Sequence, residues 1–497
     1  MRSFYDDKEA FGCKTDLDLR VYTSRLLGRD ASLVLHGGGN TSVKSTVTNL
    51  LGESEEVLYV KGSGWDLATI EAEGFAPVRM DALLGMAELK ELGDTDMVAQ
   101  QRLAMTNPSA PNPSVEAILH AIIPFKFVDH THADAVVTIT NTHGGEEKIR
   151  EIYGDRVLVI PYIMPGFVLA KLVYDMTRDV VWEELDGMVL MNHGLFTFSD
   201  DGKKSYEKTI ELVDAAEKYL EKNGAVLECE SAASSVDLLT LAKIRKEVSN
   251  LKGVATISIF NESDLAVHFS KQDVEKIAVQ GPLTPDHVIR TKRVPALLGD
   301  DVSADLARFV KEYKEYFEAN EHGETLLNPA PNFAILKGRG TLSFGANTKE
   351  ANIIKDINEH TFEAILKAQK LGGYKALSAK DIFEVEYWSL EQAKLKNGAK
   401  TAPLSGKIAI VAGLERADML KAQGAAVVRC DAVKSEEISA VVERTVKSFG
   451  GIDIVVADGE VFTLSSDLNT HTAHQELLKQ CAPFLKLGVE TPHQLFM

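Results

Sequence analysis

A pair of histidines separated by one residue is the strongest chemical signal in this sequence. The stretch Asp129-His130-Thr131-His132 would place both imidazoles on one side of a strand, because successive strand side chains alternate between its faces. A third imidazole, His193, stands at the end of the apolar run MVLM, where Gly194 starts a turn. Three histidines with an open fourth position suit a catalytic zinc ion. The alternative is a chance HxH pair and an ordinary strand-end histidine.

A carboxylate upstream could complete such a centre. Glu116 and His120 in PSVEAILH are four residues apart and would share one face of a helix. Near a divalent cation, Glu116 could carry protons to and from a substrate carbon or oxygen. The alternative is a solvated helix glutamate.

Two glycine-rich segments could bind an anion. In His36-Gly-Gly-Gly39-Asn40-Thr-Ser42, backbone N–H groups can converge on an anion while side chains add donors. In Lys61-Gly-Ser63-Gly64, a cation could lie over a phosphate or carboxylate. Each segment alone could equally be an ordinary turn, and neither has the GK[ST] of a Walker motif.

These residues need an α/β scaffold to position them. Apolar runs such as Val57–Val60, Ala135–Ile139 and Met188–Met191 have the length of strands and alternate with helical stretches and glycine-rich turns. The segment Lys203–Lys222 carries an apolar stripe at helical spacing before Gly224. We expect a first domain over residues 1–225, closed by this helix.

The region 226–400 contains a possible echo of the first. GTLSF (340–344) followed by a long helix resembles GLFTF (194–198) followed by another, which indicates either an old duplication or convergence on a common pattern. The second copy has Arg339 where the first has His193, and its upstream histidine, His287, lies in TPDHVIRTK. A copy derived by duplication would therefore have lost the metal site.

Composition narrows the classes of partner. The 497 residues exceed one core at roughly 150 residues per domain, and a hydrophobic content of 45% is that of a globular protein. A net charge of −19 disfavours nucleic acid and anionic membranes. The four cysteines form no CxxC pair, and neither a signal peptide nor a long apolar span is present, so we expect a cytoplasmic protein.

Five of these motifs together resemble a known family. GGGNTS, KGSG, PSVE, HTH and MNHG have the order and spacing of class II (zinc-dependent) sugar aldolases of the aldolase/adducin family, over residues 15–225. KGSGWDLA, TPDHVIRTK and EYWSLEQAKL resemble the fusions of rhamnulose-phosphate aldolase with a short-chain dehydrogenase, over nearly the whole chain.

The resemblance implies roles for the residues above. His130, His132 and His193 would bind one Zn²⁺ per subunit, and Glu116 would be the acid/base; the phosphate-side loops would contribute Gly39, Asn40, Ser42, Lys61, Ser63 and Gly64. The substrate would be a sugar or sugar phosphate, such as rhamnulose 1-phosphate, split into dihydroxyacetone phosphate and a hydroxyaldehyde. The family also uses a tyrosine from a neighbouring subunit; Tyr153 and Tyr162 are candidates, and the role stays unassigned. A homo-oligomer, favoured as a tetramer, is implied.

The last hundred residues resemble a damaged dehydrogenase. LSGKIAIVAG, GAAVVRCD and FGGIDIVVAD are three strand-like runs of a doubly wound sheet. The turn after the first run has one glycine, too few to bind a dinucleotide pyrophosphate, so Asp431 would have no adenine side to recognise. Ala457-Asp458-Gly459 replaces the Asn-Asn-Ala-Gly of the family. No YxxxK pair occurs. We expect neither NAD binding nor hydride transfer.

Together these inferences predict an α/β protein. Its parts would be a class II aldolase-like α/β/α domain (1–225), a middle α/β region that is possibly a degenerate repeat (226–400), and a truncated Rossmann-like remnant (401–497). Three alternatives stay open: a bifunctional aldolase and NAD-dependent dehydrogenase, another metal-enolate enzyme such as an epimerase, dehydratase or decarboxylase, and a non-catalytic adducin-like interaction protein.

Overall fold

A computed structural model describes residues 1–229, 235–395, 401–413, 416–431, 434–457, 459–466 and 474–491. The chain forms two compact units, each assembled from separate segments. The first comprises Met1–Leu227, Leu283–Asp286 and Ala364–Leu395, and the second comprises Glu228–Pro282, His287–Glu363 and Lys396–Met497. The α/β class predicted from the sequence is confirmed, whereas the division into three domains stays a prediction.

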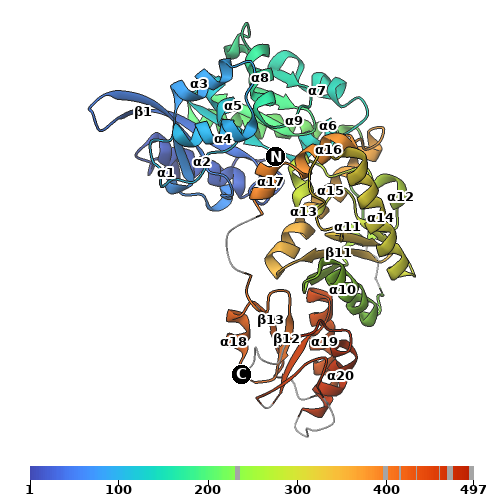
Figure 1. The fold of residues 1–497 in the computed structure, drawn as a ribbon. Helices are drawn as coiled ribbons and strands as arrows, with labels where there is room; N and C mark the ends of the chain where they lie inside the picture. Colours follow the sequence, from blue (N-terminus) through green and yellow to red (C-terminus); the bar gives the residue numbers. More distant parts are fainter. Residues whose placement is uncertain are drawn as a thin grey trace. The chain divides into compact units, whose positions relative to one another are not determined.

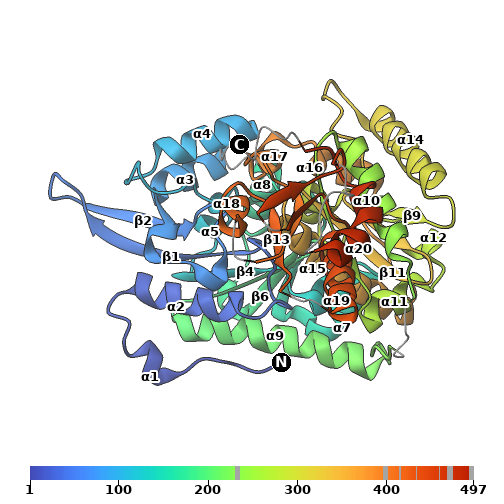
Figure 2. The same cartoon turned by 90° about the horizontal axis from the view of Figure 1, so that it is seen from below.

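The first unit is built on a seven-stranded sheet with the order β3-β2-β1-β4-β7-β6-β5. Neighbouring strands are antiparallel except for β5 and β6, which are parallel. Figures 1 and 2 show β1 and β2 extending beyond the sheet as a hairpin. The strands are β1 (Asn40–Thr48), β2 (Ser54–Lys61), β3 (Phe75–Arg79), β4 (Phe127–Thr131), β5 (Val157–Ile160), β6 (Gly187–Leu190) and β7 (Gly194–Ser199).

Helices cover both faces of this sheet. On one face α2 (Asp16–Gly28), α6 (Asp134–Thr140) and α9 (Gly202–Lys222) share a core with Val189 and Leu195. Figure 2 shows α2 and α9 lying side by side. On the other face α5 (Ala117–Ile122) and α8 (Phe167–Met176) share a core with Met188 and Phe196. Successive strand residues thus pack into opposite cores, because successive side chains of a strand point to opposite faces of the sheet. The remaining helices before residue 227 are α1 (Asp7–Ala10), α3 (Met80–Glu88), α4 (Asp94–Leu103) and α7 (Gly145–Tyr153).

One expected strand is a helix. Val57–Val60 lies in β2 and most of Met188–Met191 in β6, and α9 matches the expected helix Lys203–Lys222, but Ala135–Ile139 lies within α6. All five residues of that run are buried. A short helix buried on every side has no polar positions, so its sequence shows no helical period.

The middle of the second unit repeats the strand arrangement of the first. Its sheet has the order β8-β11-β10-β9, with the same antiparallel and parallel pairings as β4-β7-β6-β5. The strands are β8 (Ile257–Asn261), β9 (Ala296–Leu298), β10 (Phe333–Leu336) and β11 (Gly340–Gly345). The helices are α10 (Leu238–Lys252), α11 (Asp264–Ser270), α12 (Val274–Ile277), α13 (Val288–Thr291), α14 (Val302–Asn320) and α15 (Thr348–Lys370).

The register of the two sheets agrees residue by residue. Thr131 pairs with Leu195, the residue after Gly194, and Asn261 pairs with Thr341, the residue after Gly340. A Cβ at either glycine would lie 2.4 Å from the carbonyl oxygen of its partner strand, so both positions need glycine. Shared register and a shared steric need favour duplication over convergence.

This register also shows what stands in place of the three histidines. Phe260 and Glu262 correspond to His130 and His132, and Arg339 corresponds to His193. The second copy therefore lacks the three-imidazole cluster.

The last part of the chain forms a sheet with the order β13-β12-β14-β15. The three expected runs are parallel strands, namely β12 (Ile408–Val411), β13 (Ala426–Arg429) and β14 (Ile454–Ala457). An antiparallel strand that the sequence did not predict, β15 (Glu460–Phe462), follows. The helices are α18 (Ala417–Ala422), α19 (Ser435–Phe449) and α20 (Gln475–Leu485). Residues 414 and 415 of the glycine-poor turn, and Asp458, lie outside the described residues, and Asp431 is exposed.

The strand that carries two of the histidines is fixed by a buried ion pair. Arg20 on α2 contacts the Asp129 carboxylate, and both side chains are fully buried. The hydroxyl of Ser205 on α9 donates a hydrogen bond to the same carboxylate. Strand β4 is therefore tied to two helices immediately before His130.

We predict that Arg20→Met destabilises the protein by about 3–5 kcal/mol, because it leaves the buried Asp129 charge without its partner. Arg20→Met combined with Asp129→Leu should recover most of that loss, since no buried charge remains. The exposed pair of Arg178 with Asp175 provides the control, and Arg178→Met should change stability little. Urea unfolding of the four proteins measures the effect, and equal stability of Arg20→Met and Arg178→Met would contradict it.

Candidate metal centre

Three imidazoles meet at one end of the first sheet. His130 lies in β4, His132 directly follows that strand, and His193 lies in the turn between β6 and β7. The turn is tight because Asn192 adopts a left-handed conformation, with φ of 59°. One nitrogen of each ring lies within 4.8 Å of the other two, and the Nε2 atoms of His130 and His132 are 3.1 Å apart.

The rings of His130 and His132 are oriented by contacts on their other nitrogens. The Nδ1–H of His130 donates to the carbonyl oxygen of Leu195 at 3.1 Å, and its ring stacks on Phe196 with centroids 4.1 Å apart. The Nδ1 atom of His132 lies 3.5 Å from Oδ1 of Asp286. Both Nε2 atoms are thereby directed toward the shared centre, which is how metal-binding histidines are usually held.

The Glu116 carboxylate faces the same centre. Its Oε2 atom is 3.6 Å from Nε2 of His130, and its Oε1 atom is 3.6 Å from Nε2 of His193. Glu116 is the residue that precedes α5 rather than a residue inside a helix, as the sequence had suggested. Its Oε1 atom is buried without a hydrogen-bond partner. An acceptor in that position is available to a metal-bound group or a substrate proton.

A chain of hydrogen bonds holds Glu116 in place. The amide Nδ2 of Asn40 donates to Oε2 of Glu116 at 2.5 Å, and the Nε2–H of His120 donates to Oδ1 of Asn40. The hydroxyl of Ser42 then donates to Nδ1 of His120 at 2.8 Å. Asn40 pairs with His130 across β1 and β4, which places the amide beside the imidazole. Asn40 and Ser42, predicted in the anion loop, are here engaged with the carboxylate and its support.

Burial and charge set the protonation of this cluster. Burial lowers the pKa of His130 to about 4 and that of His132 to about 3, so both rings are neutral near pH 7. Burial works to raise the pKa of Glu116, but His130, His193 and the Asn40 hydrogen bond outweigh it and lower this pKa to about 2. Neutral imidazoles beside an ionised carboxylate are the forms that bind a cation.

The glycine loops lie against this centre. Gly39 has φ of 60°, and a Cβ there would lie 2.6 Å from the carbonyl oxygen of His130, so only glycine fits. Lys61, at the end of β2, donates to the carbonyl oxygen of Gly37 at 2.9 Å, and burial lowers its pKa to about 8. The backbone N–H of Ser63 donates to the carbonyl oxygen of Asn112 at 2.8 Å, while Gly64 has φ of 84°. The two predicted loops and the PSVE segment thus adjoin one another.

Asp286, Glu391 and Lys394 also belong to this unit. They lie far along the sequence, and the sequence did not predict them near this centre. Helices α16 (Ala379–Glu386) and α17 (Ser389–Ala393) precede Lys394, which forms an ion pair with the buried Glu391. Burial works to lower the pKa of Lys394, but Glu391, Asp286 and Glu116 outweigh it and raise this pKa. The only signals were the motifs TPDHVIRTK and EYWSLEQAKL, which contain these residues.

Comparisons with known proteins agree with this geometry. Residues 19–220 match the Class II Aldolase and Adducin N-terminal domain, and residues 235–395 match the Aldolase class II, second domain. The chain carries class II aldolase/adducin family domains. A curated relative, "Uncharacterized oxidoreductase YuxG" of Bacillus subtilis (strain 168), is 28% identical over 94% of this chain and 75% of its own length.

Solved structures are similar to part of this chain. An N-terminal class II aldolase domain from Thermoplasma acidophilum is 44% identical, covering 44% of this chain and 99% of that chain, with a TM-score of 0.41. L-fuculose-1-phosphate aldolase from Thermus thermophilus is 16% identical, covering 41% of this chain and 95% of that chain, with a TM-score of 0.27.

The two tyrosine candidates differ in surroundings. In the aldolase domain, Tyr153 is buried and its hydroxyl donates to the carbonyl oxygen of Leu212 at 2.7 Å, which commits it to the core. The Tyr162 hydroxyl is buried without a hydrogen-bond partner, and burial raises the pKa of this group. Neither hydroxyl contacts the three histidines, so the proton-donating tyrosine stays unassigned.

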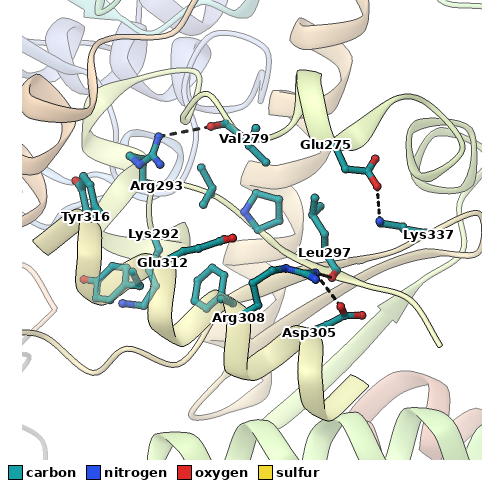
Figure 3. A pocket seen from close by; sticks show the side chains of 14 residues that line it. Glu275, Val279, Lys292, Arg293, Leu297, Asp305, Arg308, Glu312, Tyr316 and Lys337 are labelled. Carbon is teal, nitrogen blue, oxygen red and sulfur yellow. Dashed lines mark hydrogen bonds and ion pairs between the residues drawn. The ribbon is translucent and has the colours of Figure 1, made fainter. Parts of the chain in front are cut away.

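The second family domain contains a cavity of about 470 Å³ along α14. Figure 3 shows Lys292 beside the aromatic side chains of this helix, and its Nζ lies 3.6 Å from the Tyr313 ring centroid. In its lining, one ion pair joins Lys337 to Glu275 and another joins Arg308 to Asp305 within α14. No residue predicted for the metal centre lines this cavity.

No helix in the described part of the chain combines the length and apolar character needed to cross a bilayer.

We predict that the metal-free protein loses stability as the pH falls below 6.5. The pKa values of His130 and His132 are depressed to about 4 and 3 in the folded state, so the unfolded chain takes up protons first. Stability is full above pH 6.5 and is lost progressively toward pH 4. Thermal melting after EDTA treatment at pH 7.5, 6.5, 5.5 and 4.5 measures this, with the exposed His322→Gln variant as control. A melting temperature that is constant over this range would contradict the prediction.

Proposed function

We propose that this protein is a zinc-dependent aldolase that splits a ketose 1-phosphate, such as rhamnulose 1-phosphate, into dihydroxyacetone phosphate and a hydroxyaldehyde. The observation that carries the proposal is the convergence of three imidazoles on one point with the Glu116 carboxylate 3.6 Å from two of them. The family domains supply the reaction class, because the chain carries both a class II aldolase N-terminal domain and a second domain.

The donor set fits zinc. Three histidine nitrogens with room for another ligand are a common catalytic zinc set, whereas hard cations such as Mg²⁺ prefer oxygen ligands. Oε1 of Glu116 is a buried acceptor without a hydrogen-bond donor, which a nearby cation or its ligand would satisfy. When bound, zinc would supply a Lewis acid for the carbonyl and hydroxyl oxygens of the ketose.

Glu116 would then move the proton. Its Oε2 atom is held by Asn40, so Oε1 is the oxygen free to accept a proton from the substrate hydroxyl and return one to carbon. The hydrogen-bond chain from Ser42 through His120 to Asn40 fixes the carboxylate against rotation. Such fixing keeps the base within reach of the reacting atom.

Charged groups beside the centre favour an anionic substrate. The buried ammonium group of Lys61 and the partly exposed ammonium group of Lys394 lie within electrostatic range of each other and of Glu116. Gly39, Ser63 and Gly64 belong to the predicted phosphate-side loops and adjoin Lys61. We assign the substrate phosphate to this side of the centre.

A second candidate function is an NAD-dependent oxidoreductase activity of the C-terminal sheet. The name of the curated relative, an oxidoreductase, favours testing it. Against it stand the glycine-poor turn after β12 and the lack of a YxxxK pair in the sequence. Fluorescence titration with NADH separates the two proposals, because an aldolase with a remnant of a dehydrogenase binds no dinucleotide.

We also propose a cytoplasmic homo-oligomer, with a tetramer favoured. The hairpin of β1 and β2 exposes Leu50 and Leu51 at its tip, a surface that an interface between subunits would cover. Light scattering of the purified protein measures the mass.

We predict one zinc per chain in the purified protein and loss of that zinc in the His130→Ala, His132→Ala double variant. Glu116→Gln should keep the metal but release aldehyde from the ketose 1-phosphate roughly 10²- to 10⁴-fold more slowly, because only the base is removed. Elemental analysis and a coupled assay for dihydroxyacetone phosphate measure these changes. Retention of zinc by the double variant, or full activity of Glu116→Gln, would overturn the assignment.

We predict that Lys394→Met raises KM for a phosphorylated ketose by roughly 10- to 100-fold, the worth of one charged hydrogen bond. The variant is made together with Glu391→Gln, so that no buried carboxylate loses its partner. The control is Lys380→Met, an exposed lysine of α16 that pairs with Glu384. An equal KM in the two variants would assign the phosphate to other groups.

A further inference from the structure

We propose that Asp286, which lies outside the N-terminal family domain, is a positioning residue of the metal centre that orients His132 through Nδ1. The proposal rests on the proposed function, because it assumes that His132 binds the metal through Nε2. The N-terminal family match ends at residue 220, yet Leu283–Asp286 belongs to the first compact unit.

The contact has the geometry of a carboxylate behind a metal-binding histidine. Oδ1 of Asp286 is 3.5 Å from Nδ1 of His132, and the opposite nitrogen, Nε2, is 3.1 Å from Nε2 of His130. A carboxylate in this place would accept the Nδ1–H on a small closing movement, fix the tautomer and raise the basicity of the other nitrogen. The carbonyl oxygen of Leu195 serves His130 in the same way. Two ligands of the cluster are thus oriented, one by backbone and one by Asp286.

The segment that carries Asp286 is anchored rather than loosely placed. The hydroxyl of Thr284 is buried and donates to Oδ1 of Asp286 at 2.6 Å. One residue earlier, the carbonyl oxygen of Leu283 accepts a hydrogen bond from Nδ2 of Asn141 at 3.0 Å. These two buried hydrogen bonds hold the segment and one oxygen of the carboxylate beside the His132 ring.

Asn141 links the same segment to the third histidine. Its Oδ1 atom accepts a hydrogen bond from Nδ2 of Asn192 at 2.9 Å, and Asn192 directly precedes His193. The backbone of Asn141 also accepts from the N–H of Lys375 at 2.7 Å, so a second late segment meets it. The buried Asn141 therefore joins the turn of one ligand to the segment that orients another.

The surrounding charges agree with this role. The Asp286 carboxylate opposes the effect of burial, which lowers the pKa of His132 to about 3. The imidazoles of His130 and His193 lower the pKa of His132, whereas the carboxylates of Asp286 and Glu116 raise it. The Asp286 carboxylate thus makes the His132 ring a stronger electron donor to a bound cation.

The test is the zinc affinity of the full chain, measured by competition with a chromophoric chelator at pH 7.5. Asp286→Asn should raise the dissociation constant for zinc roughly 10- to 100-fold, as loss of such a contact does in other metal sites. Asp286→Glu should recover part of this loss. The matched control is Glu384→Gln, which removes the same charge from an exposed residue of α16 in the same unit.

A second variant separates positioning from simple charge. Thr284→Val leaves the Asp286 charge but removes its anchor, so zinc affinity should fall by a smaller factor. Circular dichroism and melting of the metal-free proteins check that all variants fold alike.

The outcomes distinguish this inference from the proposed function. Weaker zinc binding in Asp286→Asn but not in Glu384→Gln supports it. Wild-type affinity in Asp286→Asn, or an equal loss in Glu384→Gln, overturns the role of Asp286 while zinc binding by the wild type preserves the metal centre. Absence of zinc binding in the wild-type protein overturns both.

Discussion

A buried carboxylate without enough hydrogen-bond donors is the constraint around which the first unit is organised. Glu116 is ionised and buried, and of its two oxygens only Oε2 receives a hydrogen bond, from Asn40. Leaving a charge in that state is expensive unless a cation shares the site. The imidazoles of His130 and His193 approach it to 3.6 Å, but burial keeps His130 neutral near pH 7. A cation bound by the imidazoles would resolve the imbalance, and the same arrangement leaves Oε1 available for chemistry.

The sheet makes this convergence possible because β4 ends where its antiparallel neighbours β1 and β7 begin. Asn40 pairs with His130, and His130 pairs with Phe196, so three adjacent strands present their side chains in one row on one face. The ion pair of Arg20 with Asp129 makes this row rigid, because it ties β4 to α2 immediately before His130. At strand ends the sheet positions the side chains precisely, and the adjoining turns leave room for a ligand to enter.

Local pattern was enough to predict β2, β6, the three parallel strands of the last sheet and α9. The strands are short apolar runs between turn residues, and α9 has one apolar stripe at helical spacing. Local pattern failed for Ala135–Ile139, where burial on all sides removed that spacing. The histidines could be predicted from spacing because HxH on a strand needs only local geometry. The hydrogen-bond chain through Asn40 could not, because it depends on which residue of β1 lies opposite His130. Asp286 and Lys394 were beyond reach for the same reason, since only the folded chain brings such distant segments to the site.

The repeated sheet explains how a second domain could come to serve the first. In the copy, Phe260, Glu262 and Arg339 occupy the places of the three histidines, so it kept the strand register while losing the cluster. Because the copy has no metal cluster of its own, changes in its loops can leave the three-histidine site of the first unit intact. The segment Leu283–Asp286 lies between the strands β8 and β9 of the copy, yet it packs in the unit of the intact site and brings a carboxylate to His132. The copy thus differs from the first sheet in two ways, since it has no three-imidazole cluster and it carries a carboxylate that contacts the cluster of the first.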